Sequence, residues 1–252
     1  MTASTPVLAV DGLRMAFGGV DAVVDVSFRV DAGELVALIG PNGAGKTTCF
    51  NLVNGQLRAD AGSVSLQGER IDGLPPRDIA RRGVGRTFQV AATFASMTVR
   101  ENVQMALIAR DGLQRGVTSR AGELMGAEAD ALLERVRMTR FADHGCATLA
   151  YGDAKRVELA LALACRPRLL LMDEPTAGMS PRSRGRLMDL ASALARKENI
   201  AVLFTEHDMD IVFGHADRVI VLDRGRIIAE GTPAAIRVDA RVRAVYLGTD
   251  AP

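Results

Sequence analysis

The sequence predicts an α/β fold with a mostly parallel sheet and an inserted helical subdomain. Apolar segments of strand length, such as residues 33–40 and 168–174, alternate with longer amphipathic segments, such as residues 181–198. Strands that alternate with helices in this way form a parallel sheet covered on both faces. Between residues 90 and 148 the period is helical, so this stretch is expected to form a small helical unit outside the sheet.

The N-terminal part is expected to form strands joined by tight turns. Residues 7–17 and 24–30 alternate between apolar and polar side chains, and residues 62–71 predict another strand between glycine turns. A helix is expected to open at about Lys46, directly after a glycine-rich loop. These strands precede the helical unit, so they belong to the first half of the core.

The spacing of apolar residues also predicts the elements of the helical unit and of the second half of the core. Helices are expected within residues 97–110 and 121–138. The core then continues, in order, as helix 153–165, strand 168–174, helix 181–198, strand 200–206, strands within 217–231 and two short C-terminal helices.

Composition and charge exclude several classes of protein. Hydrophobic residues make up 48% of the 252 residues, and 31 basic against 30 acidic residues give a net charge of +1. Nucleic-acid binders usually carry a basic tract, so no nucleic-acid partner is expected. Cys49, Cys146 and Cys165 form no CxxC pair, which predicts buried thiols without a disulfide framework. Neither a signal peptide nor a membrane span is expected.

The glycine-rich loop carries the clearest chemical signal. Residues 40–48, GPNGAGKTT, match G-x-x-x-x-G-K-[ST] between a predicted strand and a predicted helix. Such a loop turns backbone N–H groups toward phosphate oxygens, and the helix adds the positive end of its dipole. Lys46 would face the outer phosphates and the Thr47 hydroxyl would bind Mg²⁺. The loop residues expected to bind a nucleotide are Gly40, Pro41, Asn42, Gly43, Ala44, Gly45, Lys46, Thr47 and Thr48.

A pair of acidic residues ends the apolar segment at residues 168–174. Asp173 would reach the Mg²⁺ shell from the C-terminal end of this strand, where α/β sheets bind ligands. Glu174 comes directly after it, and a carboxylate beside the metal can polarise a water for attack on the γ-phosphate. Together with the phosphate loop, the pair predicts hydrolysis of a nucleoside triphosphate.

Four further features stand in a fixed order along the chain. Gln89 closes GRTFQ, LAYGD at residues 149–153 opens a predicted helix, TAGMS at 176–180 follows the acidic pair, and His207 follows the next strand. This order resembles that of the ATP-binding cassette (ABC) family, and the resemblance covers nearly the whole chain. It implies a P-loop ATPase core with an N-terminal antiparallel β subdomain and an inserted α-helical subdomain.

The resemblance also implies how the chain is divided and what the site residues do. Residues 1–252 form one ABC ATPase domain, with the helical subdomain at 90–152 and the core at 1–89 and 153–252. Phe17 stands where the family stacks an aromatic ring on adenine. The expected catalytic residues are Glu174, His207, Gln89 and Lys46. The expected metal ligands are Thr47, Gln89 and Asp173, and the expected cofactors are ATP and Mg²⁺.

The stretch at residues 149–153 is similar to the family's signature motif, Leu-Ser-Gly-Gly-Gln. In that family the motif faces the ATP of a second subunit, so Leu149 and Gly152 are expected to bind nucleotide in a head-to-tail dimer. Ala150, Tyr151 and Asp153 depart from the usual pattern, and Ala150 removes a hydroxyl donor.

Three expectations concern the surroundings of this motif. The following helix is expected to start near Asp153, with Lys155 and Arg156 offsetting its charge. A Cβ on Gly152 is expected to lie between the backbone and the phosphate. Ser180 stands where the family commonly has Asp.

Several stretches are similar to the ATP-binding subunit of branched-chain (hydrophobic) amino-acid importers, and to the longer of two such subunits. They include DEPTAGMSP and RVRAVYLG. The resemblance implies a peripheral protein at the cytoplasmic face of the inner membrane. Its expected partners are integral membrane permease subunits, a second ATPase subunit of the same or a similar kind and, indirectly, a periplasmic or extracellular substrate-binding protein. Residues 90–102, with Phe94 and Met97, are expected to receive a helix of a membrane subunit.

Two alternatives remain open at this point. The ATPase subunits of urea and short-chain amide importers are similar, and substrate choice belongs to other subunits. A soluble ABC ATPase of DNA repair or translation is the alternative from another class. Such proteins usually carry two cassettes, a coiled-coil insert or basic arms, and none of these is visible in the sequence.

Overall fold

A computed structural model describes residues 5–88, 92–112 and 125–247 of the chain. Its six-stranded sheet has the strand order β10-β9-β3-β8-β7-β6, and its four-stranded sheet has the order β2-β1-β4-β5. In the larger sheet all neighbours pair in parallel except β9 and β10. Its strands are β3 (Leu35–Ile39), β6 (Val84–Thr87), β7 (Leu169–Asp173), β8 (Ala201–Thr205), β9 (Arg218–Asp223) and β10 (Arg226–Gly231).

The smaller sheet is antiparallel throughout. Its strands are β1 (Leu8–Phe17), β2 (Val20–Val30), β4 (Ala61–Leu66) and β5 (Glu69–Arg70). The predicted class, a mostly parallel sheet with an N-terminal antiparallel sheet and added helices, is confirmed.

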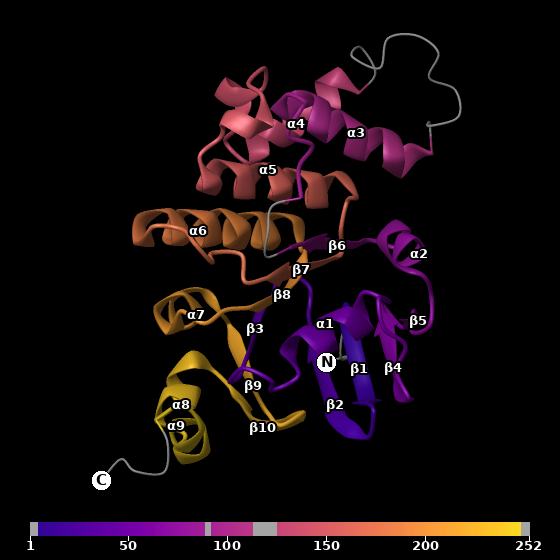
Figure 1. Ribbon diagram of the computed structural model, residues 1–252, viewed down its shortest axis with the longest axis vertical. Helices are drawn as coiled ribbons and strands as arrows, with labels where there is room; N and C mark the ends of the chain where they lie inside the picture. Colours follow the sequence, from indigo (N-terminus) through magenta and orange to yellow (C-terminus); the bar gives the residue numbers. More distant parts are fainter. Residues whose placement is uncertain (1–4, 89–91, 113–124, 248–252) are drawn as a thin grey trace.

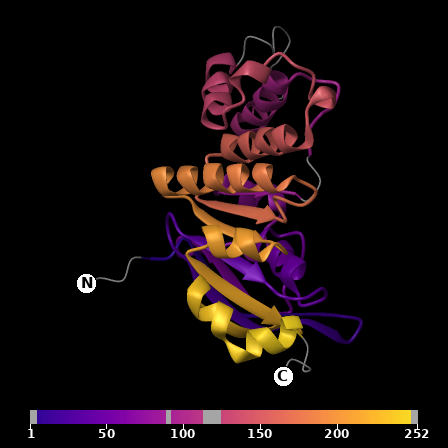
Figure 2. The same cartoon turned by 90° about the vertical axis from the view of Figure 1, so that its left-hand side faces the viewer.

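Helices cover both faces of the larger sheet and form a separate stack beyond it. They are α1 (Lys46–Val53), α2 (Pro76–Arg81), α3 (Val99–Asp111), α4 (Gly126–Arg135), α5 (Tyr151–Ala164), α6 (Pro181–Glu198), α7 (Met209–His215), α8 (Pro233–Val238) and α9 (Ala240–Leu247). Figures 1 and 2 both show α6 on the sheet, α5 on α6, and α3 with α4 outermost. Among the described residues, every helix is too short or too polar to span a lipid bilayer.

The alternation of side chains along the central strand creates two cores. Leu35, Ala37 and Ile39 of β3 pack into a core that includes α5 and α6. Val36 and Leu38 point the other way, into a core that includes α1 and the four-stranded sheet. Because successive strand residues face opposite sides, one apolar strand supplies both cores. Helices α1 and α5 therefore lie on opposite faces of the larger sheet.

Some elements differ from the sequence prediction. Helices α2 and α7 and strand β6 were not expected, and α5 begins at Tyr151, two residues before Asp153. The earlier start arises because Ala150 keeps an extended backbone (ψ 147°) while its carbonyl accepts bonds from the N–H groups of Asp153 and Ala154. The thiols of Cys49 and Cys146 are buried and that of Cys165 is half-buried, all three free.

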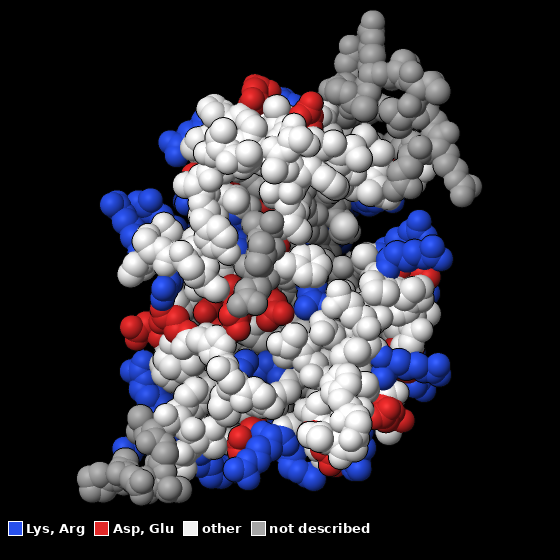
Figure 3. Space-filling view, in the orientation of Figure 1, with Lys and Arg blue, Asp and Glu red and all other residues white. Residues whose placement is uncertain are grey.

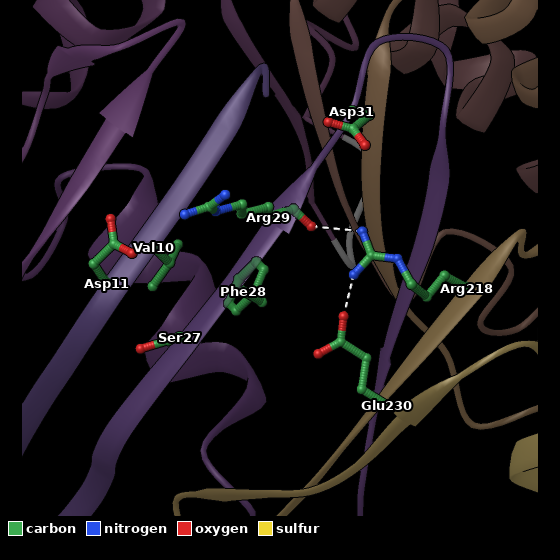
Figure 4. Close-up of a pocket in the computed structure, with 8 residues that line it drawn as sticks. All are labelled: Val10, Asp11, Ser27, Phe28, Arg29, Asp31, Arg218 and Glu230. Atoms are coloured by element: carbon green, nitrogen blue, oxygen red, sulfur yellow. Dashed lines mark hydrogen bonds and ion pairs between the residues drawn. The ribbon is translucent and has the colours of Figure 1, made fainter. Parts of the chain in front are cut away.

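A charged hollow marks the joint between the two sheets (Figure 4). Its volume is about 510 Å³, and Arg218 of β9 spans it. The guanidinium donates to the Arg29 carbonyl at 2.7 Å, to Glu34 at 2.8 and 2.9 Å, and to Glu230. Glu34 and Glu230 neutralise Arg218 within the larger sheet, and the bond to the Arg29 carbonyl joins β9 to β2 of the smaller sheet.

Charge is dispersed over the face seen in Figure 3. Acidic side chains gather across the middle of this face, and most lysines and arginines lie around its rim. The presence of both signs on this face agrees with a net charge near zero.

Candidate functional site

The glycine-rich loop joins β3 to α1, and two of its glycines are required by close approach. A Cβ on Gly40 would lie 2.2 Å from the Leu222 carbonyl oxygen, and one on Gly45 would lie 2.4 Å from that of Ala22. Both residues also have positive φ, 155° and 102°. Any other residue would displace β9 or β2, so the loop holds its shape only with glycine at these positions.

The N-terminus of α1 is open toward the loop. Gly45 is its N-cap, no side chain caps the helix, and its first turn carries no acidic residue. Backbone N–H groups and the positive end of the helix dipole therefore point at the same place. This arrangement attracts an anion, and a phosphate is its usual ligand.

Lys46 is 8% exposed and lies against its own loop. Its ammonium donates to the carbonyl oxygens of Gly40 at 2.6 Å and Pro41 at 3.0 Å. Burial lowers the pKa of Lys46, and the carboxylates of Glu174 and Asp173 oppose this shift. The structure thus brings the loop lysine near both predicted acidic residues.

Asp173 ends β7 beside the loop, and two side chains hold its carboxylate. The Thr205 hydroxyl donates to Oδ1 at 2.8 Å, and Arg86 Nη2 lies 3.4 Å from Oδ2. Thr205 and Arg86 come from the strands on either side, β8 and β6. Sequence reasoning missed both residues, because their relevance depends on the strand order.

Glu174 and His207 meet at the ends of neighbouring strands. His207 Nε2 lies 2.9 Å from Glu174 Oε1. Glu174 has a φ of 44°, in the left-handed region that a residue with a long side chain rarely adopts. Its N–H donates to Thr205 Oγ1 at 3.0 Å, which supports this conformation. Such backbone strain is typical of functional sites.

Other predicted site residues lie around this centre. Phe17 ends β1 with 47% of its surface exposed, so its ring is open to a flat partner. Thr47 is exposed at the first turn of α1 and Thr48 is half-buried. Gln89, predicted as a catalytic residue and metal ligand, lies outside the described residues.

The signature stretch starts α5 on the other face of the sheet from α1. Ala150 is the N-cap and its methyl group accepts no capping bond, and Gly152 lies in the first turn. A Cβ on Gly152 would lie 3.2 Å from Met179 Cε. Within the chain, such a Cβ would meet the chain's own 176–180 segment. The expectation that it would also come between the backbone and a partner's phosphate stays a prediction.

Lys155 also differs from its predicted role. Its ammonium is buried, 3.0 Å from Glu158 Oε2, and it donates to the Phe88 carbonyl. Glu158 Oε1 accepts from the Phe88 N–H at 2.7 Å. Of the two basic residues expected to offset Asp153, only Arg156 lies near it, at 3.5 Å. Lys155 instead helps to fix the end of β6 against α5.

Comparison with known proteins places these features in one family. The model of the family described as ABC transporter matches residues 23–177, more than half of the chain, and that described as branched-chain amino acid ATP-binding cassette transporter matches residues 226–252. A phosphate loop, an acidic pair and a histidine on an α/β core define a nucleotide-hydrolysing P-loop protein. The chain belongs to the ABC transporter family, and within it is an ATPase that binds adenine nucleotide.

Individual relatives agree over nearly their full length. The high-affinity branched-chain amino acid transport ATP-binding protein BraF of Pseudomonas aeruginosa is 42% identical, covering 97% of this chain and 99% of the relative. The crystal structure of an ATP-binding cassette in its ADP conformation has a TM-score of 0.87 at 30% identity, covering 96% and 99%. The dimeric, post-hydrolysis structure of another cassette, bound to ADP and phosphate, has a TM-score of 0.75 at 26% identity, covering 90% and 98%.

Proposed function

We propose that this chain is the ATP-hydrolysing subunit of an importer for branched-chain or other hydrophobic amino acids. The observation that carries the proposal is the match at the C-terminus, residues 226–252, to a family described for branched-chain amino acid transporters. That match lies outside residues 23–177, which match the general ABC transporter model, so it distinguishes among ABC proteins where the ATPase motifs cannot. The 42% identity to BraF supports the same substrate class.

The residues at the loop suit a magnesium–ATP complex. Thr47 and Asp173 offer the hard oxygen ligands that Mg²⁺ prefers, and Gln89 is proposed as a third. No cluster of three His, Cys, Asp or Glu among the described residues could hold a metal alone, so the phosphate oxygens would complete the shell. Bound Mg²⁺ would neutralise charge on the transferred phosphate. Lys46 would then exchange its loop carbonyls for the outer phosphates.

Glu174 and His207 supply the proposed chemistry of hydrolysis. Glu174 would accept the proton of a water aligned with the γ-phosphate. His207 Nε2 lies 2.9 Å from that carboxylate and would hold Glu174 in position. His207 would also donate a hydrogen bond to the γ-phosphate. Thr205 fixes the backbone from which Glu174 projects.

A second ATPase subunit, the same chain or a similar one, is proposed to complete the site. Helices α1 and α5 lie on opposite faces of the larger sheet. Leu149 and Gly152 would therefore serve the nucleotide of a partner through the start of α5. A related cassette forms a dimer in its ADP- and phosphate-bound state, which supports this arrangement.

Permease subunits are proposed to bind a cleft between the core and the helical stack. Its volume is about 360 Å³, and it is bordered by Gln56, Ala80, Arg86, Phe88 and Leu161. Phe94, 58% exposed, and the half-buried Met97 follow on the adjacent segment and are the candidate apolar contacts. We accordingly propose a peripheral position at the cytoplasmic face of the inner membrane, with a substrate-binding protein acting indirectly.

The proposal is tested by transport in proteoliposomes that contain this chain with the membrane subunits that co-purify with it. ATP inside the vesicles should drive uptake of leucine delivered by the binding protein, and Glu174→Gln should abolish it. Phe94→Asp should reduce uptake while the isolated chain stays folded. Uptake of urea or acetamide instead of leucine would favour the amide-importer alternative. Failure to co-purify with any membrane protein would favour a soluble ABC ATPase.

A further inference from the structure

Arg86 lies between the predicted metal carboxylate and the cleft. Its side chain is 8% exposed and comes from β6, the edge strand beside β7. Nη2 is 3.4 Å from Asp173 Oδ2, while Nη1 donates to Asn51 Oδ1 at 2.9 Å and Gln56 Oε1 at 3.1 Å. Among the described residues, this nearly buried cation therefore has one carboxylate partner, and that carboxylate is the one assigned to Mg²⁺.

The contact between Arg86 and Asp173 supplies charge more than geometry. At 3.4 Å it is long for a charge-assisted hydrogen bond, whereas the Thr205 hydroxyl lies 2.8 Å from the same carboxylate. Arg86 Nε is buried and has no hydrogen-bond partner among the described residues. Thr205 thus orients Asp173, and Arg86 mainly lowers the negative potential that Asp173 offers to a cation.

We propose that Arg86 opposes metal binding at Asp173 through its charge. This inference rests on the proposed magnesium–ATP site. Like charges repel, so a divalent ion at Asp173 must overcome the guanidinium that already faces it. The Mg²⁺ contribution to ATP affinity is consequently smaller than the loop, Thr47 and Asp173 alone would give.

The position of Arg86 connects this effect to the cleft. Its guanidinium lies over the Phe88 ring, 5.2 Å from the centroid, and both residues border the cleft with Gln56. Phe88 is held at both backbone polar groups by Glu158 and Lys155 of α5. A segment seated in the cleft therefore contacts the same charge that faces Asp173.

The test compares nucleotide affinity with and without the metal. Isothermal titration with a non-hydrolysable ATP analogue gives Kd in Mg²⁺ and in EDTA for the full chain. The Kd in EDTA divided by the Kd in Mg²⁺ measures how much the metal contributes to affinity. Arg86→Met should raise this ratio about tenfold, because it removes a nearby cation at similar volume. Arg86→Lys keeps the charge and should leave the ratio near that of the parent.

Each outcome bears on a different claim. If the parent responds to Mg²⁺ but Arg86→Met leaves the ratio unchanged or lowers it, Arg86 is only a structural ion pair and the inference is overturned. If the affinity of the parent ignores Mg²⁺, the proposed metal site fails first and the inference fails with it. Thermal unfolding checks that Arg86→Met is folded; if it is not, Arg86→Gln takes its place with the same expected rise.

Discussion

At the scale of single residues, the Thr205 hydroxyl joins the two acidic residues that follow β7. It donates to Asp173 Oδ1 at 2.8 Å and accepts from the Glu174 N–H at 3.0 Å. Thr205 is 1% exposed, so no water replaces these bonds cheaply. One hydroxyl thus positions both the proposed metal ligand and the proposed general base.

Replacing Thr205 tests this role. Thr205→Val keeps the shape but removes the partner of a partly buried carboxylate oxygen and of an N–H group. The expected loss is about 1–3 kcal/mol in the free energy of unfolding, together with slower ATP turnover. Thr205→Ser keeps the hydroxyl and serves as the control. Equal stability of the Val and Ser variants in urea unfolding would contradict the account.

Lys46 and His207 should separate binding from chemistry. Lys46→Ala removes the charge that faces the phosphates and should weaken ATP binding itself. His207 contacts Glu174, so His207→Ala should leave affinity nearly intact and lower turnover. Isothermal titration with a non-hydrolysable analogue measures both. An equal loss of affinity in the two variants would show that these roles are misassigned.

At the scale of elements, α5 begins without a capping side chain. Its N-cap Ala150 has the extended backbone that a capping serine adopts, φ −61° and ψ 147°. Ala150→Ser should therefore stabilise the isolated chain by about 0.5–2 kcal/mol, whether or not nucleotide is present. At this chain length, 1 kcal/mol corresponds to about 2–4 °C in Tm.

Scanning calorimetry without nucleotide measures this gain. Ala154→Ser places the same hydroxyl inside α5, where it cannot cap the helix, and should give no gain. A gain that appeared only with ATP would instead indicate a contact between the new hydroxyl and the phosphate of a partner subunit.

A salt-bridge cluster ties together the helices of the outer stack. Glu128 of α4 binds Arg110 of α3 at 2.7 Å and Arg166, just beyond α5, at 3.0 Å. The hydrogen bond from Arg110 and then that from Arg166 lower the pKa of Glu128 from 4.5 to about 2. A depressed carboxyl pKa stabilises the fold above the unfolded value, and the benefit is lost as pH falls from 4.5 toward 2.

Glu128→Gln should remove this pH dependence. Because a third of the Glu128 side chain is exposed, the benefit at pH 7 should be no more than about 1 kcal/mol. Urea unfolding from pH 7 to pH 3 should show the parent losing its advantage over Glu128→Gln in acid. Glu134→Gln removes an exposed carboxylate from the same helix and is the control. A constant difference across this range would exclude the cluster as its source.

At the scale of the whole molecule, local patterns predicted the core but not the contacts between strands. The continuous apolar run of β7 was sufficient to predict a buried strand. The helical spacing of apolar residues in α6 was sufficient to predict a helix with one buried face. β6 reads Val-Gly-Arg-Thr, so its buried Arg86 breaks the apolar signal of a strand. Helix α7 has only seven residues, although the Asp208 cap could have revealed it.

The candidate site shows the same division. Short contiguous motifs identified the loop, the acidic pair and His207, because the residues that define each of these features are adjacent or nearly adjacent in the sequence. Thr205, Arg86 and the Lys155–Glu158 pair depend on which strands and helices become neighbours, and one sequence does not contain that information. The functional roles of the predicted residues, and the division at residues 90–152, stay predictions.

The Glu174→Gln variant affects the whole assembly. It should keep ATP binding, since the loop contacts survive, and should lower turnover by about 10²–10⁴, the usual contribution of a positioned general base. An ATP molecule that is bound but not hydrolysed would hold two subunits together through both signature motifs.

Sedimentation velocity of Glu174→Gln with Mg²⁺ and ATP therefore tests the central claim most directly. The account predicts a dimer in the presence of ATP and a monomer in ADP or without nucleotide, whereas the parent returns to monomer as ATP is consumed. A Glu174→Gln protein that binds ATP yet sediments as a monomer would contradict a shared site in a homodimer. One that consumes ATP at the parent rate would contradict the role of Glu174.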